Sequence, residues 1–138
     1  MTFQGMKKYY IILFCVQVMV AIGAIPAGYA FVKDPSGAGL GASVDLLVNS
    51  PLKDFLIPGL FLLIVNGFGQ LGAAVFSILN KPVAGKIGIF LGFVLMLWIV
   101  IQVWWISLSS FMQPLFFGIG LFEAMLGWTI IRKHASGL

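Results

Sequence analysis

Glu123 is the one acidic residue of this chain that falls inside a long apolar segment. Apolar or glycine residues fill positions 115–122 before it, and only Thr129 interrupts the apolar run between Glu123 and Arg132. A carboxylate at the centre of a membrane helix is disfavoured by about 2.5–3.5 kcal/mol, so an acid there indicates a site that binds a proton or a cation. The alternative is that a protonated Glu123 only hydrogen-bonds a neighbouring helix.

Small residues predict the direction in which Glu123 points. Gly120, Ala124 and Gly127 lie three residues before it and one and four residues after it, on one face of a helix. A face of small residues lets another membrane helix approach closely. We therefore expect Glu123 to face the interior of a helix bundle.

Three other apolar segments carry amide side chains on faces of the same kind. The residues that share each face are Gln17 with Ala21, Ala24 and Gly28; Asn66 and Gln70 with Gly69, Ala73 and Ser77; and Gln102 with Gly88 and Gly92. With a rise of about 1.5 Å per residue, Asn66 and Glu123 fall near the membrane midplane. Gln70 and Gln17 fall about one turn to the cytoplasmic side and Gln102 about one turn to the outer side. The candidate ligand- or proton-binding residues are therefore Glu123, Asn66, Gln70 and Gln17.

No Lys, Arg or His lies within the apolar segments to neutralise a Glu123 anion. An uncompensated carboxylate in an apolar interior is unfavourable, so we expect the carboxyl group to be neutral unless water or a cationic ligand reaches it. Such a group can exchange a proton for a cation. It can equally act as an interhelical contact, which contributes about 0.6 kcal/mol per hydrogen bond and at most about 2 kcal/mol.

The composition is that of an integral membrane protein. Of the 138 residues, 61% are hydrophobic and 9% are charged, whereas soluble domains usually carry about 25% charged residues. Four apolar segments predict transmembrane helices over about 9–32, 55–79, 87–108 and 114–131. We expect an all-α fold in which residues 1–138 form a single transmembrane domain, an antiparallel bundle of four helices.

The longest connection, residues 33–54, is expected on the outer side. Residues 34–37, Asp-Pro-Ser-Gly, have the composition of a tight turn. After them Leu40, Val44, Leu47 and Val48 repeat at helical spacing, which predicts a short amphipathic helix in the interface or over the bundle mouth. This segment can serve as a lid or partner surface, or it can simply connect two helices.

Basic residues predict the orientation of the bundle in the membrane. Cytoplasmic segments carry an excess of Lys and Arg. With both termini in the cytoplasm, two basic residues, Lys33 and Lys53, lie outside. The six that lie inside are Lys7, Lys8, Lys81, Lys86, Arg132 and Lys133. We therefore expect a multi-pass protein of the cytoplasmic membrane with both termini inside.

Two alternatives concern the N-terminus. Residues 28–30, Gly-Tyr-Ala, after a basic start would suit a cleaved signal peptide, but the organised face of the first segment favours a retained helix. Residues 3–5, Phe-Gln-Gly, are typical of the end of a protease tag site, in which case Met6 is the native start.

Glycine spacing predicts close helix packing but does not indicate which helix, in this chain or in another, packs against each glycine. Gly88 and Gly92 form a GxxxG motif, and Gly120 and Gly127 lie on the face of Glu123. These faces suit internal packing, a homo-oligomer or another membrane-protein partner. Because the basic residues flank helix ends, where they meet lipid headgroups, we expect the lipid bilayer and not nucleic acid as the partner of this positive charge.

Catalytic, metal and cofactor chemistry has little support. Asp34, Asp45 and Asp54 fall on the outer side without a nearby His or Cys. Cys15 is the only cysteine, which excludes paired-cysteine redox chemistry, and His134 beyond the last helix argues against heme. We expect no catalytic residue, no metal site and no cofactor.

Three functions remain open. The first is a non-enzymatic accessory, interaction or scaffold subunit, for which Glu123→Gln would be nearly neutral. The second is a proton- or cation-coupled transporter or channel that uses Glu123, and the third, with the least support, is a membrane enzyme.

In length and helix number the chain resembles the small multidrug-resistance exporters, whose membrane glutamate exchanges protons for drug cations. That resemblance covers the architecture alone. The exporters carry the glutamate in the first helix, where this chain has Gln17, and the strong charge bias here disagrees with an antiparallel dual-topology dimer. No site residue is carried over from that family.

Overall fold

The computed structural model describes residues 3–106 and 111–135, and this part of the chain is helical with no strand. Three long helices are α1 (Phe3–Lys33), α4 (Val83–Ile106) and α5 (Met112–Ala135). A fourth helical segment is continuous and consists of α2 (Leu56–Phe61), the π-helix η3 (Leu62–Gly69) and α3 (Gln70–Ile78). In the described ranges, four helical segments are long and apolar enough to cross a membrane, which indicates a multi-pass membrane protein.

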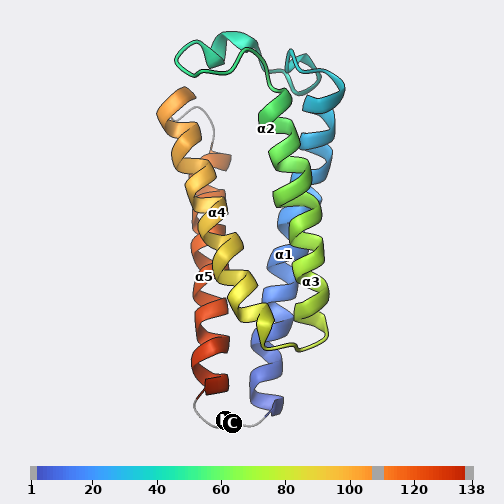
Figure 1. Ribbon diagram of the computed structural model, residues 1–138, viewed down its shortest axis with the longest axis vertical. Helices are drawn as coiled ribbons and strands as arrows, with labels where there is room; N and C mark the ends of the chain where they lie inside the picture. The colour runs from blue at the N-terminus through green and yellow to red at the C-terminus, as the bar shows by residue number, and fades with distance from the viewer. Residues whose placement is uncertain (1–2, 107–110, 136–138) are drawn as a thin grey trace.

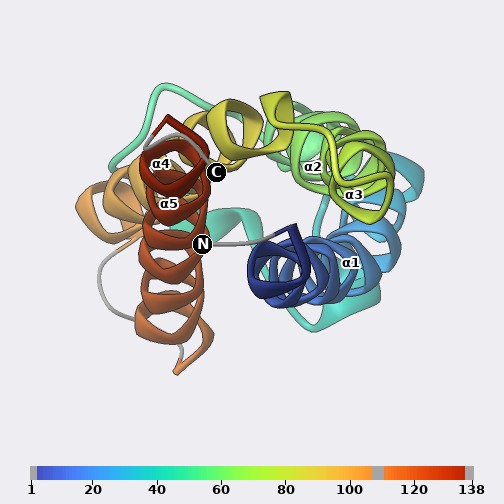
Figure 2. The same ribbon diagram turned by 90° about the horizontal axis from the view of Figure 1, so that it is seen from below.

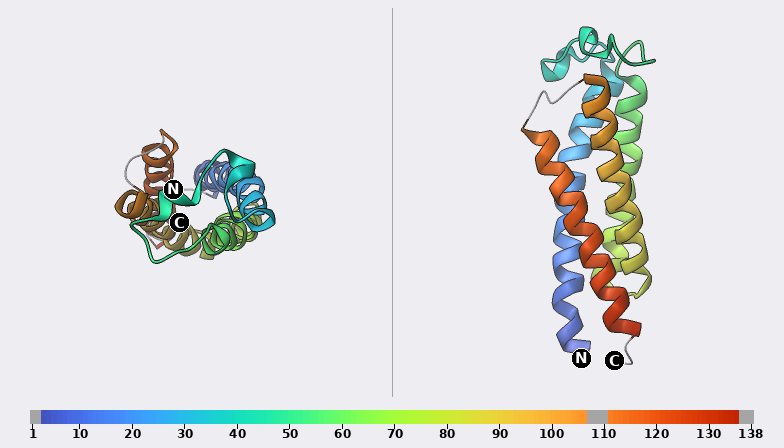
Figure 3. Two further views of the ribbon diagram at one scale, coloured as in Figure 1. Left: turned by 90° about the horizontal axis from the view of Figure 1, so that it is seen from above. Right: turned by 90° about the vertical axis from the view of Figure 1, so that its left-hand side faces the viewer.

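The start of α1 and the end of α5 lie at the same end of the molecule, which we call the terminal end (Figure 1). Residues 34–55 lie across the opposite end, which we call the loop end. The side view in Figure 3 shows the same arrangement, with all four long segments running between the two ends.

The helices fall into two groups. In Figure 1, α4 and α5 stand together on one side, and α1, α2 and α3 stand together on the other. The view along the bundle in Figure 2 gives the same division. We refer to α1, α2, η3 and α3 as the N-terminal group, and to α4 and α5 as the C-terminal group.

Glycine allows close packing inside the N-terminal group. A methyl group at Gly28 of α1 would lie 2.6 Å from the Leu63 nitrogen and 2.8 Å from the Gly59 oxygen. Such distances are too short for any side chain, so the backbones touch at this point. The predicted small face of the first helix is therefore confirmed as a packing face.

The C-terminal group is closed by two glycine crossings. A methyl group at Gly92 would lie 2.5 Å from the Gly120 oxygen, and one at Gly127 would clash with the Gly85 oxygen. Gly92, Gly120 and Gly127, three of the glycines expected to pack helices, therefore lie where α4 meets α5. Gly88 differs from them because it faces the Leu13 side chain of α1, in the other group.

The two groups are packed against each other at the terminal end. A cluster of buried side chains there combines residues of α1, α4 and α5. Its members are Met6, Tyr10, Leu13, Val16, Ala84, Leu126 and Ile130. The ammonium group of Lys133 in α5 also lies 5.7 Å from the centre of the Tyr9 ring in α1. The terminal end is therefore the closed end of the bundle.

The long helices extend beyond the predicted apolar limits. α1 begins at Phe3 and not near residue 9, because Met6 is buried in the terminal cluster. α4 begins at Val83 directly after Pro82, four residues before the predicted start. α5 runs from residue 112 to 135, and its last turn contains three basic side chains that suit the negative end of the helix dipole. The predicted end of the third helix at 108 lies outside the described residues.

The π-helix η3 was not predicted, since the sequence indicated a regular helix over about 55–79. It contains two buried residues, Asn66 and Gly67. A methyl group at Gly67 would lie 2.6 Å from the Ile25 Cγ1 atom of α1. π-helical turns are rare and occur frequently at functional sites. Over eight residues, the period of a π-helix is so close to that of an α-helix that a hydropathy pattern cannot distinguish the two.

Residues 34–55, which we call the loop-end segment, contain two short 3₁₀ helices, η1 (Ala38–Leu40) and η2 (Val44–Leu47), and not the single amphipathic helix that was predicted. Gly37 and Gly41 have φ angles of 84° and 72°, a left-handed conformation that interrupts a helix on both sides of η1. Of the four apolar residues behind the prediction, Leu47 alone is buried. The predicted turn at residues 34–37 is present, with Gly37 N–H donating to the Asp34 carbonyl at 3.0 Å.

Candidate functional site

The carboxyl group of Glu123 lies where the two helix groups meet. The Nε2 atom of Gln70 in α3 donates a hydrogen bond to Oε1 of Glu123 at 2.9 Å. The Nε2 atom of Gln17 in α1 donates to Oε2 at 3.4 Å. Both side-chain oxygens of Glu123, in the C-terminal group, therefore accept an amide hydrogen bond from the N-terminal group.

Ser77 extends this network on its α3 side. Its hydroxyl donates to the Gln17 Oε1 atom at 2.7 Å and also lies 3.3 Å from the Ala73 carbonyl. Ser77, Gln17, Glu123 and Gln70 are all 0% exposed. We call these four residues the acid–amide network. Ser77 was not a predicted site residue, although its spacing of seven from Gln70 places it on the same helix face.

The predicted orientation of Glu123 is confirmed. Gly120, Ala124 and Gly127 are buried on the same face of α5 as Glu123. The structure also brings Gln17 and Gln70 to the carboxyl group, as their depth suggested. Three helices thus contribute to one buried polar contact in the middle of the bundle.

Gln102 lies too far along α4 to reach Glu123. Gly88 lies beside the backbone of Glu123, with 3.6 Å between a methyl group at Gly88 and the Glu123 oxygen. Gln102 is 14 residues farther along α4, which corresponds to about 20 Å of helix. It accepts a hydrogen bond of 3.5 Å from Gln113 of α5 instead. The glycine contacts set this register of α4 on α5, so Gln102 lies farther from Glu123 than its predicted depth, about one turn from the midplane, indicated.

Asn66 does not join the acid–amide network. It is 0% exposed, and neither its Oδ1 nor its Nδ2 atom has a hydrogen-bond partner among the described residues. It lies in the π-helix, four residues before Gln70 and on the same inward side of the segment. This predicted site residue is therefore buried beside the network but is not part of it.

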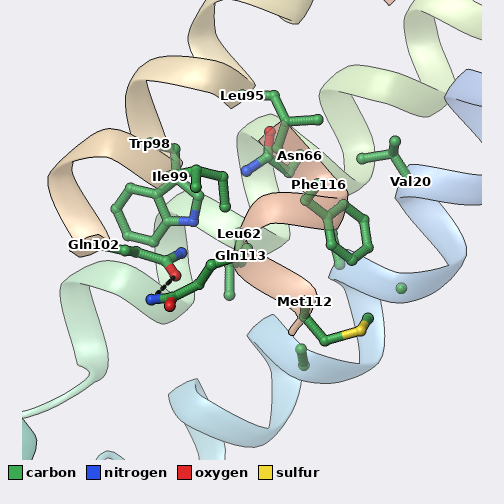
Figure 4. Close-up of a pocket in the computed structure, with 13 residues that line it drawn as sticks. Val20, Leu62, Asn66, Leu95, Trp98, Ile99, Gln102, Met112, Gln113 and Phe116 are labelled. Atoms are coloured by element: carbon green, nitrogen blue, oxygen red, sulfur yellow. Dashed lines mark hydrogen bonds between the residues drawn. The ribbon is translucent and has the colours of Figure 1, made fainter. Parts of the chain in front are cut away.

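A cavity of about 310 Å³ lies next to Asn66, between the two helix groups. All four long segments line it, as the close-up in Figure 4 shows for ten labelled side chains. Small residues of α1, namely Gly23, Ala24 and Ala27, leave room on one wall. The bundle is thus packed tightly at the terminal end and hollow towards the loop end.

Trp98 provides a second polar atom at this cavity. Its Nε1 atom is buried and has no hydrogen-bond partner among the described residues. Its ring stacks on Phe61 of α2, with 4.6 Å between the ring centres, and so connects the two groups. Sequence reasoning missed Trp98, because a tryptophan in an apolar helix looks like any other lipid-facing aromatic residue.

A smaller cavity of about 110 Å³ lies on the loop side of the first. The two cavities share Leu62, Trp98 and Gln102. Leu47 and Phe55 of the loop-end segment line the smaller one, and Phe55 stacks on Phe31 at 4.7 Å between ring centres. The loop-end segment therefore contacts the side chains that separate the larger cavity from the loop end.

The described residues contain no group of three His, Cys, Asp or Glu side chains that could hold a metal ion. No family model, curated protein or solved structure matches the chain. The fold and the site therefore define only the class of protein: a helical multi-pass membrane protein with a buried acid–amide network beside a cavity.

Proposed function

We propose that this protein is a small, non-enzymatic carrier of the cytoplasmic membrane that couples the movement of a small molecule to a proton or cation bound at Glu123. The observation that carries this proposal is the position of the carboxyl group. Glu123 bridges the two helix groups through Gln17 and Gln70, and Gln70 is one helical turn from Asn66 at the cavity. Binding of a proton or a cation to the carboxyl group would therefore alter the hydrogen bonds that join the two groups.

The distribution of basic residues supports an antiparallel bundle with both termini in the cytoplasm. The N-terminal lysines, the α3–α4 connection with the first turn of α4, and the end of α5 gather six of the eight Lys and Arg residues at the terminal end (Figure 1). Lys33 and Lys53 belong to the loop end. Because cytoplasmic segments are rich in basic residues, the cavity would lie in the outer half of the membrane.

The amide of Gln70 suits both protonation states of Glu123. Its Nε2 atom donates to the carboxyl group, while its Oε1 atom has no partner in the described part of the chain. An amide rotated by half a turn presents its oxygen where its nitrogen was. Gln70 can therefore donate to a carboxylate and, after rotation, accept from a carboxylic acid. The site would bind and release a proton without leaving either group unpaired.

The separation into two glycine-packed groups supports a movement of one group against the other. Tight backbone contacts hold each group together, through Gly28 in one and Gly92 in the other. The contacts between the groups include the terminal cluster, the acid–amide network and the stack of Trp98 on Phe61. Protonation would exchange hydrogen bonds to a carboxylate for weaker ones between neutral groups. This weakening would let the groups rock about the terminal end, a rigid-body movement of the kind that provides alternating access.

Proton flux in reconstituted vesicles tests the proposal. Vesicles that contain the protein and an internal pH indicator would be exposed in turn to tetraphenylphosphonium, divalent metal ions and a neutral aromatic amide. We expect one of these to change the internal pH with wild type but not with Glu123→Gln. Asp45→Asn, in the loop-end segment, is the matched control and should behave as wild type. Equal responses of wild type and Glu123→Gln, or none in either, would contradict the carrier.

An accessory or scaffold subunit is the second candidate. The observation that favours it is that both oxygens of Glu123 already accept hydrogen bonds, so the network can act as interhelical glue. For this role Glu123→Gln should leave flux absent and stability almost unchanged, since glutamine keeps the shape and one acceptor.

A further inference from the structure

We propose that the cavity beside Asn66 binds a neutral, largely apolar small molecule that carries a carboxamide-like group. The inference rests on the carrier function proposed above and narrows its cargo to an uncharged compound. Any coupled charge would then be the proton at Glu123. Two buried polar groups of the cavity wall have no hydrogen-bond partner among the described residues.

Asn66 is the first of these groups. A buried amide without hydrogen bonds is costly, and native proteins rarely contain one. The same bundle satisfies the amide of Gln17, which both donates to Glu123 and accepts from Ser77. Asn66 offers one donor group and one acceptor side by side, and neither is paired with any residue that the structure describes. A ligand carboxamide has the complementary acceptor and donor side by side, so one group satisfies both atoms.

Trp98 is the second group. Its Nε1–H is a donor, and it lines the same cavity as Asn66 (Figure 4). A carboxamide oxygen can accept two hydrogen bonds, one from Asn66 and one from Trp98. Stacking on Phe61 fixes the Trp98 ring before a ligand arrives, and such preorganisation lowers the cost of binding.

The rest of the lining determines the remainder of the ligand. The described residues around the cavity include no Asp, Glu, Lys, Arg or His, so nothing there compensates a charge. Val20, Leu95 and Ile99 provide apolar walls, and Phe116 adds an aromatic ring (Figure 4). A volume of about 310 Å³ is at the lower end for small-molecule sites. These features fit a compact molecule with one or two rings and a single polar group.

Two other occupants fit the cavity less well. A lipid acyl chain would suit the apolar walls but would leave Asn66 and Trp98 unpaired. Water would pair with these two groups and with the Gln102 and Gln113 amides that also line the cavity, but it would leave the apolar walls without van der Waals contacts. A carboxamide on an apolar ring satisfies both parts of the lining.

Photolabelling with two matched probes tests this inference. 4-Benzoylbenzamide is benzophenone with one added carboxamide, and both insert into nearby C–H bonds on irradiation. The full protein in lipid nanodiscs would be irradiated with each probe, and the labelled residues would be found by mass spectrometry of peptides. We expect the amide probe to label the lining residues of α1 and α5 about tenfold more than benzophenone, once each is corrected for its partition into the nanodisc.

Asn66→Leu tests the role of the amide, because leucine keeps a similar volume without the polar atoms. The ratio between the two probes should fall from about ten to about one in this variant. Ala27→Phe fills the cavity from α1 and should remove labelling by both probes. Ile22→Phe is its matched control, since Ile22 is exposed on the same helix and should not affect labelling. A tenfold preference that persists in Asn66→Leu, or equal labelling of wild type by both probes, would overturn the inference.

The outcome separates this inference from the carrier. If Glu123-dependent proton flux occurs but the amide preference is absent, the assigned cargo class is wrong and the carrier stands. If the preference is present and depends on Asn66 while no flux occurs, the binding site stands and the carrier is wrong.

Discussion

Gln70 of α3 and Glu123 of α5 are joined by a hydrogen bond of 2.9 Å that crosses the contact between the two helix groups. On its loop side lies the cavity, and on its terminal side lies the buried cluster that contains Leu13 and Ile130. The bond therefore marks the level at which the bundle changes from tightly packed to hollow. Several measurable properties depend on this arrangement.

Replacing Glu123 should show how much the acid–amide network stabilises the fold. Glu123→Leu leaves the Gln70 and Gln17 amides buried without their acceptor, so we expect the free energy of unfolding to fall by about 1–3 kcal/mol. Glu123→Gln should cost less, because one amide can still be paired. Unfolding in mixed micelles, titrated with a denaturing detergent, measures both values. A leucine variant as stable as wild type would show that the network does not hold the groups together.

Ser77 and Gln17 should be energetically coupled, since the Ser77 hydroxyl donates to Gln17 at 2.7 Å. Ser77→Ala alone and Gln17→Leu alone should each reduce stability, and the double variant should lose less than their sum. We expect a coupling energy of about 0.6 kcal/mol, the usual value for a hydrogen bond between membrane helices. Strict additivity in the double-mutant cycle would contradict this contact.

Two glycines of the C-terminal group form a matched pair for testing close packing. A methyl group at Gly92 would lie 2.5 Å from the Gly120 oxygen, whereas one at Gly118 would meet nothing within 4 Å. Gly92→Ala should therefore lower the free energy of unfolding by about 1–3 kcal/mol through overpacking. Gly118→Ala should change it by less than about 1 kcal/mol. Similar effects of the two substitutions would contradict the backbone contact between α4 and α5.

Asn66→Leu should make the protein more stable. Asn66 is buried and has no partner in the described part of the chain, so an apolar side chain of similar size removes a desolvation cost of about 1 kcal/mol or more. A residue kept for binding at the expense of stability is expected to behave in this way. Thermal unfolding without added ligand measures the effect. A clear loss of stability would mean that the Asn66 amide has a structural partner.

The orientation in the membrane can be checked with single cysteines in a Cys15→Ala background. Gly39→Cys lies in η1, where a side chain meets nothing within 4 Å, and Lys81→Cys lies in the exposed connection between α3 and α4. A membrane-impermeant maleimide should label Gly39→Cys in intact cells and Lys81→Cys only after permeabilisation. The reverse pattern would place the termini outside.

Much of the helical fold and part of the site were predictable from local patterns. The apolar lengths indicated four spans, and the spacing of Gly120, Ala124 and Gly127 placed Glu123 on a packed face. Helical periodicity also selected Gln17 and Gln70, which do contact the carboxyl group. These features follow from the sequence within a single helix and so needed no knowledge of how the helices meet.

The features that were missed depend on contacts between helices. The register of α4 on α5 is set by Gly85 and Gly92 meeting α5, and it moved Gln102 away from Glu123. The cavity exists because the small residues of α1 lie opposite Trp98, which no single segment reveals. The 3₁₀ helices of the loop-end segment depend on left-handed glycines, whose φ angles cannot be predicted from helical spacing.

The short α3–α4 connection, residues 79–82, is the point at which the chain passes from one helix group to the other. Each group carries its own backbone contacts, so cutting the chain there would break none of them. Two polypeptides expressed separately would retain their internal packing and would recognise each other through the terminal cluster and Glu123. The single chain is thus equivalent to a fused heterodimer, and a gene interrupted at this position should still encode an assembled protein.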